Sequence, residues 1–152
     1  MNDMYEKYMD QALVLARKAF ELSEVPIGAI IVDDKGQCIG TGYNSVEQDK
    51  TQNSHAELKA LYQAAQKKGD WRLKDCSLFV TLEPCTMCFA AICLSRIDTV
   101  IFGATSPLFG YKNNLDCFIR PMMSEVKVIA GIRQEACAQL LKQFFDKARL
   151  KD

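Results

Sequence analysis

Two short segments of the sequence combine the residue types that bind metal ions. Cys85 and Cys88 are separated by two residues, and His55 is the single histidine of the chain. Helix positions three residues apart project from the same side, so the two sulfurs are expected to lie together. Two thiolates and one neutral imidazole form a ligand set that suits zinc.

The number of available ligands indicates which kind of zinc site this is. A structural zinc usually takes four protein ligands, whereas the sequence offers one Cys-x-x-Cys pair and one histidine. Three protein ligands leave a fourth position for water, which is the catalytic arrangement. Zinc lowers the pKa of such a water from about 15.7 toward 7. Glu57, two residues after His55, is the candidate general acid and base that moves the protons.

Cysteine usage and the N-terminus predict a reduced, cytoplasmic protein. No positively charged segment followed by an apolar run opens the sequence, and no stretch approaches the roughly 20 apolar residues that span a bilayer. Seven cysteines, an odd number, suit free thiols or metal ligands better than a disulfide framework. The remaining five are expected to be small buried hydrophobic residues: Cys38, Cys76, Cys93, Cys117 and Cys137.

Length and composition predict one domain spanning residues 1–152. The chain is 49% hydrophobic and 25% charged, which is ordinary for a globular domain and excludes disorder and collagen-like repeats. Nineteen basic and nineteen acidic side chains give a formal charge of zero. That balance supplies no electrostatic argument for a nucleic-acid partner.

The hydrophobic pattern predicts alternating helices and strands that position these residues. The expected elements are a helix over 4–22, a hairpin of strands 27–32 and 38–43, a helix over 55–66, a strand over 77–82, a helix over 85–94, strands over 99–102 and 126–129, and a C-terminal helix whose buried stripe runs from Cys137 through Leu141 and Phe145 to Ala148. Strand-helix-strand units imply parallel neighbours. The predicted fold is a three-layer α/β/α domain with a mixed sheet of about five strands, and 77–82 and 98–103 lie centrally.

Both chemical segments begin a predicted helix. His55 opens one helix and Cys85 opens another, directly after a strand and Pro84. The positive dipole end of a helix favours thiolates over thiols there. His-x-Glu combined with Pro-Cys-x-x-Cys is far more specific than either segment alone, and it matches the signature of zinc nucleobase deaminases.

With these residues in place, the sequence resembles the cytidine deaminase-like superfamily, and specifically bacterial tRNA-specific adenosine deaminases. The resemblance covers nearly the whole chain. It is carried by the segments 24–29, 42–44, 55–57, 80–88, 95–97, 102–104 and 131–132, and by the C-terminal helix with its paired phenylalanines.

The resemblance implies roles for individual residues. His55, Cys85 and Cys88 would hold one zinc ion per chain, and Glu57 would shuttle protons. The substrate-binding groups would be Asn44, the Ala56 backbone and the apolar side chain of Ile27, with the Asn44 amide donating to a purine ring nitrogen. The implied reaction converts adenosine to inosine at the wobble position of the tRNA anticodon loop, and the implied assembly is a homodimer.

The segment Thr105–Lys112 departs from the family pattern. Ser106 stands where an acidic residue is expected, and Leu108 stands where a basic one is expected. In the family these positions touch RNA, so the departure concerns the substrate rather than the chemistry. Phe109 and Tyr111 either offer stacking surfaces for unstacked bases or pack against a dimer partner or the core.

Two other functions stay open at this point. A deaminase of a free nucleobase or nucleoside, of the guanine or cytosine type, would use the same zinc chemistry. A thiol redox protein or a purely structural zinc protein would use Cys85 and Cys88 without hydrolysis.

Overall fold

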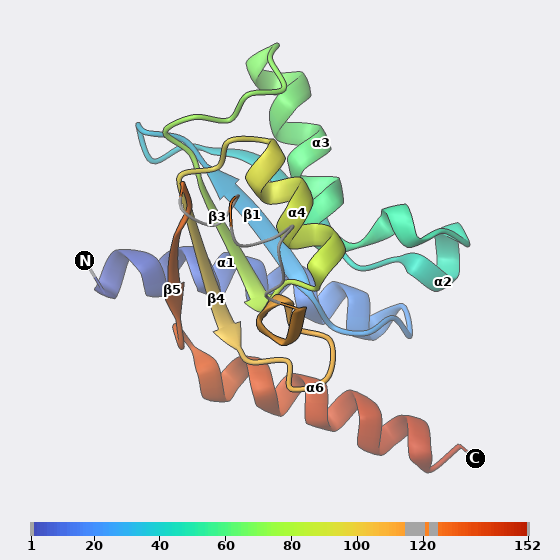
Figure 1. The fold of residues 1–152 in the computed structure, drawn as a ribbon. Coiled ribbons are helices and arrows are strands. Elements are labelled where there is room, and N and C mark those ends of the chain that lie inside the picture. Colours follow the sequence, from blue (N-terminus) through green and yellow to red (C-terminus); the bar gives the residue numbers. More distant parts are fainter. Residues whose placement is uncertain (1, 115–120, 122–124, 152) are drawn as a thin grey trace.

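The computed structural model describes residues 2–114, 121 and 125–151 (Figure 1). Its elements are α1 (Asn2–Glu21), β1 (Gly28–Val32), β2 (Cys38–Tyr43), α2 (Val46–Asp49), η1 (Gln52–Ser54), α3 (Ala56–Lys68), β3 (Ser77–Leu82), α4 (Thr86–Leu94), β4 (Thr99–Ala104), η2 (Tyr111–Asn114), β5 (Lys127–Ala130) and α6 (Gln134–Arg149). None of the helices in this described part is both long and apolar enough to cross a membrane.

The strands form one mixed sheet in the order β2-β1-β3-β4-β5. β1 pairs antiparallel with both β2 and β3, whereas β3, β4 and β5 run parallel. The predicted hairpin, the parallel neighbours and the mixed five-stranded sheet are therefore confirmed. β3 lies at the centre with β4 beside it, as their near-continuous apolar sequences predict.

Helices cover both faces of the sheet (Figure 1). Side chains of β3 alternate between the faces, with Leu78 and Val80 packing in a cluster with α3 and α4. Phe79 packs on the opposite face in a cluster with α1 and the Cys137 end of α6. This period-two alternation of apolar side chains produces the predicted three-layer arrangement.

Close packing of α3 on β2 positions the helix start that carries His55. A side-chain carbon at Gly42 would collide with the Ala56 carbonyl oxygen and crowd Lys59. The absence of a side chain at Gly42 therefore lets the first turn of α3 lie directly on the strand.

Residues 44–54, between the two predicted elements 38–43 and 55–66, contain two short helices. They form α2 and η1, which bring the chain from β2 to His55. The segment is polar and lacks apolar periodicity, so hydrophobic patterning gives no signal for it. Asp49 accepts hydrogen bonds from the Ser45 and Ser54 hydroxyls, both at 2.7 Å. These bonds hold the two ends of the segment 44–54 close together.

Six cysteines are described, and all are free thiols. Cys76, Cys93 and Cys137 are buried, which confirms the prediction for these three, whereas Cys38 is only half-buried. Burial raises the pKa of Cys137 to about 12. Cys117 lies outside the described residues.

Candidate active site

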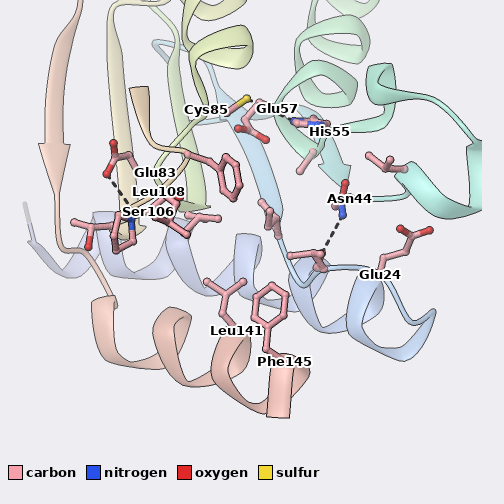
Figure 2. Close-up of a pocket in the computed structure, with 18 of the residues that line it drawn as sticks. Glu24, Asn44, His55, Glu57, Glu83, Cys85, Ser106, Leu108, Leu141 and Phe145 are labelled. Atoms are coloured by element: carbon pink, nitrogen blue, oxygen red, sulfur yellow. Dashed lines mark hydrogen bonds between the residues drawn. The ribbon is translucent and has the colours of Figure 1, made fainter. Parts of the chain in front are cut away.

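The two chemical segments meet where β3 ends (Figure 2). His55 is the residue that caps the start of α3, and Cys85 caps the start of α4 with an extended backbone. Cys88 lies in the first turn of α4 and is fully buried. The cap positions explain why local sequence spacing predicts the site, because each segment is fixed by a single helix start.

The three predicted ligands converge at one point. His55 Nδ1 lies 3.3 Å from Cys88 Sγ and 3.8 Å from Cys85 Sγ, and the three ligand atoms all lie within 4.8 Å of one another. Zinc bonds of about 2.0 Å to nitrogen and 2.3 Å to sulfur place those atoms about 3.5 Å apart in a tetrahedral site. The donor set and its spacing therefore fit one zinc ion.

Gln52 orients the imidazole, and sequence reasoning missed it. Its Oε1 lies 2.9 Å from His55 Nε2. Because this carbonyl oxygen can only accept, Nε2 donates a proton to it, and a neutral His55 would then offer the Nδ1 lone pair to a metal ion. Outer partners of this kind set the orientation of a ligand histidine. A glutamine three residues before a histidine has no recognisable spacing signal.

The two cysteine side chains have opposite pKa shifts because they are hydrogen-bonded to each other. The hydrogen bond from Cys88 lowers the pKa of Cys85 to about 4, and the hydrogen bond to His55 adds to that effect. The same Cys85 sulfur raises the pKa of Cys88, as does burial. Cys85 is therefore the thiolate that the helix start predicts, whereas Cys88 keeps its proton without a metal. Metal binding would release that proton.

Glu57 is a buried carboxyl group beside this cluster. Burial, followed by the negative charge of Cys85, raises the pKa of Glu57 to about 6, although His55 opposes the shift. Glu57 lies in the first turn of α3, and its carboxyl group lines the same cavity as His55 and Cys85 (Figure 2). A carboxyl group with a pKa near neutrality can both accept and return a proton.

A cavity of about 840 Å³ opens onto the cluster. Asn44, Ala56 and Ile27, the expected substrate-binding residues, all line it. The Asn44 backbone N–H donates to the Ile27 carbonyl at 3.0 Å, and its Nδ2 donates to the Val25 carbonyl at 3.3 Å (Figure 2). The Val25 carbonyl therefore accepts from the Asn44 side-chain amide and holds it at the cavity wall.

The C-terminal helix contributes a wall that the sequence prediction placed in the core. Leu141 and Phe145 line the cavity, and Phe145 is 44% exposed rather than buried (Figure 2). Cys137 is the buried residue of α6. The predicted stripe has the correct helical spacing, but Leu141 is only partly buried against the core cluster and, with Phe145, also lines the cavity.

The two aromatic residues of the Thr105–Lys112 segment have different environments, so each of the two alternatives applies to one of them. Tyr111 is 1% exposed and stacks on Phe89, with ring centroids 3.9 Å apart and an interplanar angle of 5°. Phe109 is 73% exposed and lines the cavity beside Leu108. Tyr111 therefore packs on the protein's own core, whereas Phe109 remains available for a ligand.

Comparison with known proteins matches this architecture to one family. Residues 2–104 match the cytidine and deoxycytidylate deaminase zinc-binding region. A tRNA-specific adenosine deaminase of Streptococcus pyogenes is 40% identical over 144 residues, which cover 93% of this chain and 90% of that protein.

Solved structures agree in fold. A structure from studies of A-to-I editing by tRNA:A34 deaminases superposes with a TM-score of 0.79 at 35% identity, covering 88% of this chain and 98% of that one. A guanine deaminase from Nitrosomonas europaea shares the fold with a TM-score of 0.82 at 24% identity, over 91% of this chain and 83% of that one. The chain belongs to the zinc-binding cytidine and deoxycytidylate deaminase family, and within it to the tRNA-specific adenosine deaminases.

Proposed function

We propose that the protein is a zinc-dependent hydrolytic deaminase that converts adenosine to inosine at the wobble position of tRNA. The observation that carries this proposal is the convergence of His55, Cys85 and Cys88 beside the buried Glu57 carboxyl group at one cavity. Three ligands with an adjacent proton carrier fit a catalytic zinc better than a structural one. A tRNA substrate implies a cytoplasmic location.

The residues divide the chemistry among them. His55, Cys85 and Cys88 would hold zinc, which when bound activates water for attack on the base. Glu57 accepts a proton from that water and returns it to the leaving amine. A C–O bond forms at purine C6, the C–N bond breaks, and adenosine plus water become inosine plus ammonia. Asn44, the Ala56 backbone and Ile27 hold the purine in place.

The mouth of the cavity supports a polynucleotide substrate. The cavity volume of about 840 Å³ lies within the range of about 300–1,000 Å³ that is typical of ligand sites. Leu108 and Phe109 are exposed and line the cavity together with Phe145. Exposed aromatic side chains bind the unstacked bases of single-stranded RNA loops.

A free-base deaminase is the second candidate. It is favoured by Ser106 and Leu108, which stand where the tRNA enzymes carry charged residues. We would incubate the protein with an adenosine-34 anticodon stem-loop, a matched stem-loop with guanosine at position 34, free adenosine, guanine and cytosine. Inosine and ammonia are expected from the first stem-loop alone. Turnover of guanine or cytosine with an untouched adenosine-34 stem-loop would refute the tRNA assignment.

We also propose that the enzyme is a homodimer. α4 is apolar around its whole circumference, and beyond its buried face it exposes Met87 at 43% and Leu94 at 57%. A helix that is apolar all round is normally buried. Light scattering combined with size-exclusion chromatography is expected to give a mass near twice 17.1 kDa. A monomer at micromolar concentration would refute the dimer.

A further inference from the structure

Two buried carboxylates of the cavity have no part in the chemistry described above. Glu24 is 2% exposed, Glu83 is 5% exposed, and both line the cavity. Among the described residues, no lysine or arginine nitrogen lies within ion-pair distance of either carboxylate. Burial of a charge is costly unless hydrogen bonds compensate it, so the partners of these oxygens indicate what the two residues do.

Glu24 binds the segment that leads from β2 toward His55. Its Oε1 accepts a hydrogen bond from the Glu47 backbone N–H at 3.0 Å, and its Oε2 accepts one from the Gln48 N–H at 2.7 Å. The next residue, Val25, accepts the hydrogen bond from the Asn44 side chain. Glu24 and Val25 together therefore fix residues 44–49, which we call the first rim.

Glu83 makes the corresponding contacts on the other side of the cavity. Its Oε1 accepts from the Ser106 backbone N–H at 3.2 Å (Figure 2). Its Oε2 accepts from the Lys112 backbone N–H at 3.4 Å. A side-chain carbon at Gly110 would collide with Glu83 Oε2. Residues 105–112, the second rim, therefore wrap closely around this one carboxylate.

The exposed tip of the second rim is held by that anchor together with the hydrogen bond from Asn113 Nδ2 to the Pro107 carbonyl at 2.7 Å. Leu108 is 81% exposed and Phe109 is 73% exposed, so little burial holds them in place. Tyr111 fixes the C-terminal end of the rim by stacking on Phe89. The N-terminal end is held at Ser106 by Glu83, and a hydrogen bond between an amide and a carboxylate is stronger than one between neutral groups.

We propose that Glu24 and Glu83 are positioning residues, each of which holds one rim of the substrate pocket through two backbone N–H groups. Substrate bound between the rims then meets side chains already in place, which lowers the cost of binding. The catalytic part of this proposal rests on the deaminase function proposed above. The structural part, the separate anchoring of each rim, does not.

Replacement of each carboxylate by an amide of the same size tests the structural part. Glutamine offers one acceptor oxygen and turns an NH₂ group toward the second backbone N–H, so one hydrogen bond is lost. Glu83→Gln is expected to speed amide hydrogen exchange about tenfold in residues 105–112 and to leave 44–49 unchanged. Glu24→Gln is expected to give the reverse pattern. Glu21→Gln, an exposed carboxylate three residues earlier, is the matched control and should change neither rim.

Steady-state kinetics test the catalytic part. In both rim variants, KM for the adenosine-34 stem-loop is expected to rise about tenfold while kcat stays within about threefold. Zinc content should remain at about one ion per chain. If wild-type protein fails to deaminate the stem-loop, the proposed function is wrong, and hydrogen exchange still decides the anchoring.

Several outcomes would overturn the proposal. If amide hydrogen exchange were the same in both rims of every variant, the carboxylates would not anchor separate segments. If a variant lost both zinc and kcat, its carboxylate would belong to the metal site. Gly110→Ala covers the case in which Glu83→Gln does not fold, because it disturbs the same contact from the rim. It should also speed exchange in 105–112 and raise KM, and wild-type values for both would refute the role of Glu83.

Discussion

The zinc-binding end and the rims of the pocket are built by different physical means. At the zinc-binding end, His55, Cys85 and Cys88 sit at the starts of two helices that pack on the sheet. At the second rim, Leu108 and Phe109 stand in solvent, and the segment is held by contacts at its base. The predicted zinc ligands are therefore positioned by the packed core, whereas the exposed side chains of the second rim rest on a few contacts at its base.

This difference fits the expectation that the sequence departs from the family pattern at Ser106 and Leu108, in the second rim. Loss of a predicted ligand would remove a metal contact, whereas the Leu108 side chain is 81% exposed and does not support the core. Variants in the two regions should therefore fail in different assays.

Loss of a ligand is expected to have the largest effect. Cys88→Ala leaves two ligands, so zinc content should fall from about one ion per chain to nearly none, and turnover should fall about 10⁴-fold or more. Metal analysis and inosine formation measure the two effects. Cys93→Ala, five residues later on the same helix, is the matched control and should keep both zinc and activity. Zinc retained in Cys88→Ala would remove Cys88 from the site.

Truncation of the buried rim aromatic should cost stability. Tyr111→Ala removes a fully buried ring that stacks on Phe89, so the free energy of unfolding should fall by about 3 kcal/mol or more. Chemical denaturation measures this change. A loss below about 1 kcal/mol would mean that Tyr111 does not anchor the second rim to the core.

Removal of the imidazole partner is expected to weaken metal binding without abolishing it. Gln52→Ala frees His55 Nε2, so zinc affinity should fall about 10- to 100-fold. Competition with a chelator measures the affinity, and Gln66→Ala, an exposed glutamine on α3, serves as control. Turnover at saturating zinc should stay near wild type. An unchanged affinity would show that Gln52 does not orient the ligand.

Truncation of the exposed aromatic should have the smallest effect, confined to the substrate. Phe109→Ala is expected to raise KM for the stem-loop about fivefold to tenfold, because base stacking on an aromatic ring contributes about 1–3 kcal/mol. The free energy of unfolding should change by less than about 0.5 kcal/mol. A stability loss comparable to that of Tyr111→Ala would erase the distinction between the two aromatics.

The sequence predicted the zinc-binding end because its signals are local. His55 and Glu57 occupy one helix start, Cys85 and Cys88 occupy another, and the alternation of strands and helices brings the two starts together. The hairpin and the parallel strand neighbours followed from the same periodicity, whereas the antiparallel pairing of β1 with β3 had no signal in it.

The rims could not be predicted because their contacts join distant polar residues. Glu24 reaches Gln48 across 24 positions, and Glu83 reaches Lys112 across 29. Neither pair has a periodic signal. Phe109 and Tyr111 are both aromatic and two residues apart, and only the position of Phe89 determines which one is buried.

The central claim is that Glu57 carries protons for a zinc-dependent deamination and is not itself a ligand. The most direct test measures zinc content and inosine formation together in Glu57→Gln, with the adenosine-34 stem-loop as substrate. We expect about one zinc ion per chain, as in the wild type, and a fall in turnover of about 10²- to 10⁴-fold. Turnover near the wild-type rate with zinc in place would contradict this account of the active site.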